Sequence, residues 1–94
     1  MPEVLVVACE STSEGWDCDV TVDDQRTTTR HQVAVRRSDL ERLAPGSSSP
    51  DDLVRRSFEF LLEREPPTSI LRAFDLPTIG RYFPEYEAAI RKRS

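Results

Sequence analysis

The residues whose types could support metal or nucleophilic chemistry are two cysteines, Cys9 and Cys18, and the single histidine, His31. Thiolate and imidazole groups bind zinc, and a cysteine beside a histidine can form a nucleophile. The strand pattern places the two cysteines side by side, but it places His31 at a turn, opposite Val22 or Asp24. Four strand residues separate Val22 from Cys18 and span about 13 Å. This separation is too long for one metal site or one hydrogen bond, so we expect no metal and no catalytic pair.

The two cysteines on their own allow two interpretations. Free cysteine is among the most buried residue types, which favours two thiols in the core. Opposed positions on neighbouring strands are also within reach of a disulfide. The chain opens on Met1, Pro2 and Glu3 without the basic start of a secretory signal, so we expect a cytoplasmic protein. Because disulfides are rare in that compartment, the prediction is two free thiols.

Other catalytic or ligand-binding patterns are missing from the sequence. The acidic residues of the N-terminal third lack the spacing and central glycine of a calcium loop, and they are typical of a solvated sheet face. The chain has three glycines, and they form neither a phosphate-binding loop nor a nucleophile elbow. We therefore predict a protein that is not an enzyme and has no cofactor.

Three antiparallel strands are predicted in the first half of the chain. Residues 4–9 form an apolar run, and residues 16–22 alternate between apolar and polar side chains. A turn centred on residues 13 and 14 aligns three apolar pairs: Leu5 with Val22, Val7 with Val20, and Cys9 with Cys18. A third strand over residues 28–36 completes a β-meander within residues 1–37.

Helices are predicted for the second half. Ser38 and Glu41 match a capping box that would start a short helix over residues 38–44. A serine cap at position 49 and a proline at position 50 start the main helix, over residues 50–65. Short helical segments should follow over residues 69–93, the first of them from position 69 to 74.

The predicted fold class is therefore α+β, and 94 residues allow one domain, residues 1–94, with one core. The longest apolar run covers only residues 4–9, which is too short to span a bilayer. The first 25 residues carry seven acids and no base. Because binding to nucleic acid requires bases that neutralise phosphates, this acidic part argues against a nucleic-acid groove on the sheet.

The first strand is apolar on both faces. Leu5, Val7 and Cys9 lie on one side, and the other side carries Val4, Val6 and Ala8. A sheet face that is open to water does not have this composition. Either the C-terminal helices cover the second face, or another chain does, and a homodimer that pairs through this strand would also hide its edge.

The C-terminal segment carries aromatic and aliphatic side chains that could either line a peptide groove or close the core over the main helix. They are Phe74, Tyr82, Phe83 and Tyr86, with Leu71, Leu76 and Ile79. The core is the favoured interpretation. The tyrosines keep polar tips, so the segment around Tyr82, Phe83 and Tyr86 is the other candidate contact surface.

The segments Ser57 to Pro66 (SFEFLLEREP), Ser69 to Leu71 (SIL), Phe74 to Leu76 (FDL) and Tyr82 to Glu87 (YFPEYE) resemble a small bacterial protein family of no known activity. The resemblance implies a stand-alone bacterial protein of about this size, and it implies no catalytic residue or cofactor.

The function that the sequence favours is a non-enzymatic protein-interaction or regulatory module, with an unidentified protein or a second copy of itself as partner. The alternative is a nucleic-acid-associated regulator of antitoxin type. It would require folding to gather the arginine-rich positions into one patch: Arg36, Arg37, Arg42, and Arg91 to Arg93.

Overall fold

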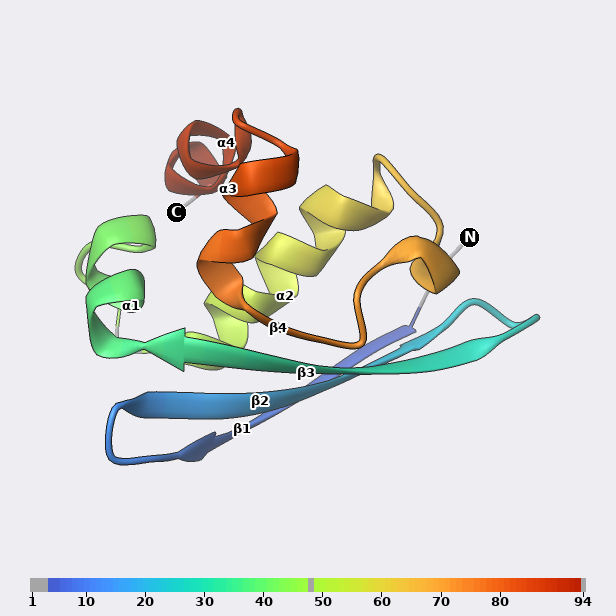
Figure 1. Cartoon of the computed structure of the whole chain (residues 1–94), viewed down its shortest axis with the longest axis horizontal. Helices are drawn as coiled ribbons and strands as arrows, with labels where there is room; N and C mark the ends of the chain where they lie inside the picture. The colour runs from blue at the N-terminus through green and yellow to red at the C-terminus, as the bar shows by residue number, and fades with distance from the viewer. Residues whose placement is uncertain (1–3, 48, 94) are drawn as a thin grey trace.

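The computed structural model describes residues 4–47 and 49–93, and it shows a four-stranded sheet covered on one face by helices (Figure 1). The strand order is β1-β2-β3-β4. The strands are β1 (Val4–Ser11), β2 (Gly15–Asp23), β3 (Thr28–Arg36) and β4 (Ala73–Asp75). The α+β class is thereby confirmed, and β1, β2 and β3 form the predicted antiparallel meander.

The predicted register of the first hairpin is confirmed. Leu5 lies opposite Val22, Val7 opposite Val20, and Cys9 opposite Cys18. This register places every apolar residue of β2 on the face toward the helices, where Cys18, Val20 and Val22 are fully buried. A shift by one residue would turn these side chains to water, so the burial fixes the register.

Helices from the second half of the chain pack on that face. They are α1 (Arg37–Leu43), α2 (Pro50–Leu62), α3 (Ile79–Tyr82) and α4 (Tyr86–Arg93), with short 3₁₀ turns η1 (Pro67–Ser69) and η2 (Leu76–Thr78). The long helix α2 lies between the sheet and the C-terminal helices. Its apolar stripe, with Leu53, Val54 and Phe58 at its centre, is buried against the sheet.

The start of α2 matches the prediction, but its end does not. The Ser49 hydroxyl accepts a hydrogen bond from the Asp52 N–H at 3.2 Å, and Pro50 is the first helical residue. The helix ends at Leu62 rather than at position 65. The Arg64 N–H donates to the Leu61 carbonyl three residues back, which tightens the last turn, and the two prolines that follow have no N–H to continue the helix.

The predicted capping box at Ser38 and Glu41 is wrong. The strand β3 runs directly into α1, so the helix begins at Arg37 and the residue that caps it is Arg36. The Asp39 carboxylate reaches back and accepts the Arg36 N–H at 3.0 Å. The acid that closes this turn therefore lies two residues before the predicted Glu41.

The helical turn predicted from Ser69 to Phe74 is also wrong. After η1 the chain is extended, and residues 73–75 add to the sheet as β4, parallel to β3. The Gln32 N–H donates to the Arg72 carbonyl at 2.7 Å, and the Phe74 ring packs near the ring of Phe58, with centroids 6.2 Å apart. The first of these contacts joins residues 40 positions apart and the second joins residues 16 positions apart, so the local pattern alone does not reveal them.

Candidate functional site

The predicted contact residue Tyr86 is buried, not exposed. Only 1% of its surface is accessible, and its ring packs edge-on against Phe60 with centroids 5.3 Å apart. Its hydroxyl lies 2.7 Å from Ser57 Oγ. Burial raises the pKa of this phenol above its ordinary value. Tyr86 belongs to the core, so its assignment to an interaction surface is wrong.

The other two predicted residues of that segment, Tyr82 and Phe83, line a pocket of about 310 Å³. The floor is made of buried aliphatic side chains from Leu61, Ile70 and Ile79. Tyr82 is 65% exposed at the rim, where the 46% exposed Leu71 lies as well. The remaining lining residues are Glu65, Ser69, Phe74, Thr78 and Phe83. This pocket is the main candidate functional site.

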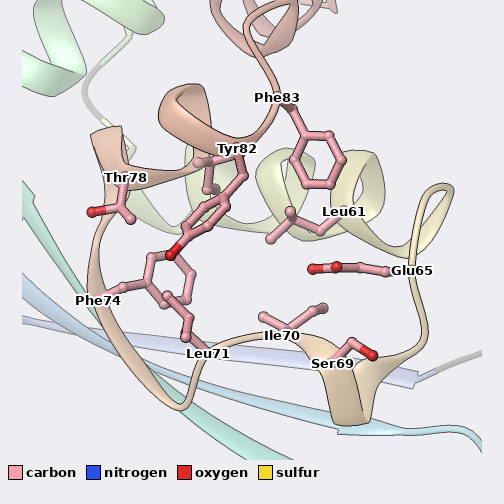
Figure 2. Close-up of a pocket in the computed structure, with 10 residues that line it drawn as sticks. Leu61, Glu65, Ser69, Ile70, Leu71, Phe74, Thr78, Tyr82 and Phe83 are labelled. Atoms are coloured by element: carbon pink, nitrogen blue, oxygen red, sulfur yellow. The ribbon is translucent and has the colours of Figure 1, made fainter.

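The pocket exists because the chain leaves α2 at two prolines, crosses to the sheet and returns over the same helix. Figure 2 shows its wall formed by the end of α2, the η1 to β4 segment, and α3. Pro66 and Pro67 cannot continue the helix, and Pro67 starts η1 instead. The return through α3 adds Ile79 and Phe83 to the same lining as Ile70.

A buried histidine holds one side of the pocket in place. The ring of His31, on β3, is 2% exposed and lies 5.2 Å from the ring of Phe58. Its Nδ1 lies 2.7 Å from the Leu71 carbonyl, and its Nε2 lies 2.9 Å from Thr29 Oγ1. Since a carbonyl only accepts, Nδ1 carries the proton and donates to Leu71. His31 thereby fixes the backbone of a rim residue.

The location predicted for His31 is therefore wrong. It lies in the middle of β3 opposite Val20, not at a turn opposite Val22 or Asp24. Its parity along the strand places it on the core face with Val33 and Val35. Both of its ring nitrogens have partners within the chain, which gives the residue a structural role.

The charged residues near the end of α2 divide into paired and unpaired groups. The Arg64 guanidinium lies 3.6 Å from the centroid of the Phe60 ring, and it contacts Glu63 at 3.3 Å and Glu85 at 3.2 Å. The pKa of the Glu85 carboxyl is held below its ordinary value by the residue's own N–H and by Arg64. Glu65 takes part in no ion pair with the described residues, and its side chain points into the pocket between Leu61 and Ile70 (Figure 2).

The outer face of β1 is the second candidate surface. Val6 is 55% exposed and Ala8 is exposed as well, while Leu5 and Val7 on the opposite side pack against the core. The helices lie on that opposite side (Figure 1), so the described C-terminal residues do not cover Val6 and Ala8. Of the two alternatives, cover by the C-terminal helices of the same chain is therefore wrong for Val6 and Ala8. The side chain of Val4 lies outside the described part of the structure.

The edge of β1 is partly closed by an arginine. The Cα atoms of Cys9 and Cys18 are 4.0 Å apart, the close spacing of a pair that exchanges no backbone hydrogen bonds. By alternation, Leu5, Val7 and Cys9 turn their N–H and C=O groups away from β2. Arg55 of α2 donates to the outward carbonyl of Leu5 at 3.0 Å. Such capping of one edge position limits strand addition there.

The two cysteines form a disulfide between β1 and β2, so the prediction of free thiols is wrong. The sequence predicted that the two cysteines face each other on neighbouring strands. The free thiols were predicted from the expected cytoplasmic location, and that part of the prediction failed. His31 is two strand positions from Cys18 rather than four. Among the described residues, no group of three histidine, cysteine or acidic side chains is placed to hold a metal ion.

The arginines proposed for nucleic-acid contact are partly engaged within the chain. Arg42 pairs with Asp39 at 3.9 Å and with Glu87 of α4 at 3.5 Å. Arg37 lies 5.9 Å from the centroid of the Trp16 ring and donates to the Ser13 carbonyl. The exposed Arg91 and Lys92 are on α4, and the side chain of Arg93 lies outside the described part.

No protein-family model matches the chain, and no curated protein or solved structure is significantly similar to it. No helix within residues 4–47 and 49–93 is long and apolar enough to cross a membrane.

Sequence reasoning identified Tyr82 and Phe83 and considered a groove formed with Leu71, Phe74 and Ile79, but it did not identify Glu65 or Ile70. Glu65 stands in a Glu-Arg-Glu run that is typical of an exposed helix end. Nothing in this run indicates whether Arg64 pairs with Glu63 or with Glu65.

Proposed function

We propose that this protein is a non-enzymatic protein-interaction module whose pocket binds an apolar side chain of a partner protein. The observation that carries the proposal is the pairing of two exposed apolar side chains, Leu71 and Tyr82, around an apolar hollow. Exposed large apolar side chains that gather at a concave site are typical of binding surfaces.

The size of the pocket favours a side chain over a cofactor. At about 310 Å³ it is at the small end of ligand sites, which span roughly 300 to 1,000 Å³. An aliphatic or aromatic anchor that enters it would bury the exposed faces of Leu71 and Tyr82. Burial of an aromatic anchor in such a pocket is the usual source of binding energy at protein interfaces.

The test is a selection from a random heptapeptide library displayed on phage, against the immobilised full chain. Peptides with a shared apolar position should be enriched and should lose at least tenfold in affinity for the Leu71→Ser and Tyr82→Ser variants. Both positions are exposed, so these changes should leave the fold intact. Val6→Ser, an exposed apolar position on the opposite face, is the matched control. Failure to enrich any peptide that depends on Leu71 or Tyr82 would refute this function.

A second candidate function is self-association through β1, and the uncovered Val6 favours it. The central residues of β1, from Val4 to Cys9, carry no charge, so two copies could pair antiparallel without repulsion between facing side chains. Pairing would join the edges of two sheets and place Val6 and Ala8 of both copies side by side on one continuous face, where they contact each other. Sedimentation velocity over a concentration series should then show a dimer, and Val6→Lys should abolish it. Thr28→Lys, on the same face of β3, should leave the dimer intact.

A further inference from the structure

The pocket has a single charged lining residue, the acid Glu65. Its other lining side chains are apolar, aromatic or hydroxyl-bearing. Glu65 is half-buried at the wall, and its carboxylate points inward between Leu61 and Ile70 (Figure 2). An occupant of the pocket would therefore contact a negative charge on an apolar surface.

The neighbouring arginine does not neutralise this charge. Arg64 is turned to the other side, where it lies over Phe60 and pairs with Glu63 and Glu85. The Arg64 Nη1 also donates to the Phe60 carbonyl at 3.1 Å, which further fixes the guanidinium. No basic side chain among the described residues therefore forms an ion pair with Glu65.

We propose that the partner segment presents a lysine or arginine next to its apolar anchor, and that this base pairs with Glu65. The inference rests on the proposed function, and it specifies the partner's chemistry. The aliphatic stem of the basic side chain would lie on Leu61 and Ile70, while its charged head meets the carboxylate.

The physical reason is the cost of desolvation. An apolar or acidic occupant would remove water from the Glu65 carboxylate without replacing the lost hydrogen bonds. A basic occupant supplies a charge-assisted hydrogen bond in return, and the partial burial strengthens it relative to a fully exposed pair. The pocket therefore discriminates in favour of a positive charge.

The experiment compares the selected peptides and their affinities for charge variants of the full chain. Lysine or arginine should be enriched at a fixed spacing from the apolar position. In fluorescence anisotropy, Glu65→Gln should weaken binding of a synthetic copy of the selected peptide about tenfold. Glu65→Lys should shift the selection toward peptides with an acid at that position. Glu59→Gln, at an exposed acid of α2 outside the pocket, should change the affinity less than twofold. Thermal unfolding checks that each variant is folded.

Two results would overturn the inference, and they are distinguishable. In the first, the selected peptides depend on Tyr82 but carry no base, and they bind the Glu65→Gln variant as tightly as the unchanged chain. This result refutes the cationic partner and leaves the proposed function standing. Selection that yields no peptide dependent on the pocket refutes both.

Discussion

The hydrogen-bonded pair of Ser57 and Tyr86 is the polar contact at the centre of the core. Ser57 Oγ lies 2.8 Å from the Leu53 carbonyl and 2.7 Å from the Tyr86 hydroxyl. Since a carbonyl only accepts, the one proton of Ser57 goes to Leu53, and Tyr86 must donate to Ser57. The hydrogen bonds therefore run from the Tyr86 hydroxyl to Ser57 and from Ser57 to the Leu53 carbonyl.

This direction predicts unequal effects of the two truncations. Ser57→Ala leaves the buried Tyr86 hydroxyl without its acceptor and should destabilise the fold by about 1 to 3 kcal/mol. Tyr86→Phe removes a donor but leaves Ser57 bonded to Leu53, so it should cost about 1 kcal/mol. Urea unfolding of both variants measures the difference, with Tyr82→Phe at an exposed position as the control. A larger loss for Tyr86→Phe would contradict the assigned direction.

The raised pKa of Tyr86 predicts a loss of stability at alkaline pH. The folded protein disfavours the phenolate, whereas the unfolded chain ionises near the ordinary value of 10.0. The stabilising contribution is therefore fully present below pH 10, and it falls by about 1.4 kcal/mol per pH unit above it. Urea midpoints from pH 8 to 11 should fall more steeply for the unchanged chain than for Tyr86→Phe. Parallel slopes would show that Tyr86 does not resist ionisation.

At the scale of elements, the pairing of β2 with β3 depends on a close approach that only glycine permits. Gly15 lies opposite Arg36, and a Cβ atom at this position would clash with the Val35 carbonyl and the Arg36 backbone. Gly15→Ala should therefore destabilise the sheet by about 1 to 3 kcal/mol. Gly80 in α3 has open space around its Cα, so Gly80→Ala should be neutral or stabilise by up to about 1 kcal/mol. Thermal unfolding of the two variants tests the contrast, and equal effects would rule it out.

The disulfide between β1 and β2 should stabilise the first hairpin. It closes a short loop, with a sequence separation of 9 residues, and a loop of this length is worth about 2 to 3 kcal/mol. Thiol titration of the native protein should find no free thiol, and two after reduction in denaturant. Reductant should lower the unfolding midpoint of the unchanged chain but not that of a Cys9→Ala/Cys18→Ala double variant. Two reactive thiols in protein that has not been reduced would contradict the bond.

The sheet register was predictable because it depends on short-range alternation. Apolar positions repeat every second residue in β2, and one hairpin turn fixes which of them face β1. The strand β4 was not predictable, since its three residues form a strand only by pairing with β3 across the whole length of α1 and α2. The free carboxylate of Glu65 was missed for a related reason. Glu65 has no basic partner among the described residues because Arg64 pairs with Glu85, which lies 21 residues further along the chain.

At the scale of the whole molecule, the two candidate surfaces lie on opposite faces. The pocket opens among the helices and the segment that precedes β4. Val6 and Ala8 are exposed on the other face of the sheet, because the helices all lie on one face (Figure 1). They share no residue, and the four-stranded sheet lies between them. Binding at one should therefore have little effect on the other, since sites without shared contacts usually behave additively.

This separation predicts that self-association and peptide binding are independent. Val6→Lys should convert a dimer to a monomer in sedimentation velocity, because a lysine on the paired strand opposes edge-to-edge contact. The same variant should bind the selected peptide with an affinity within twofold of the unchanged chain. Tyr82→Ser should show the converse, with lost peptide binding and unchanged sedimentation. A dimer that dissociates when saturating peptide is added would instead show that the two surfaces are coupled through the sheet.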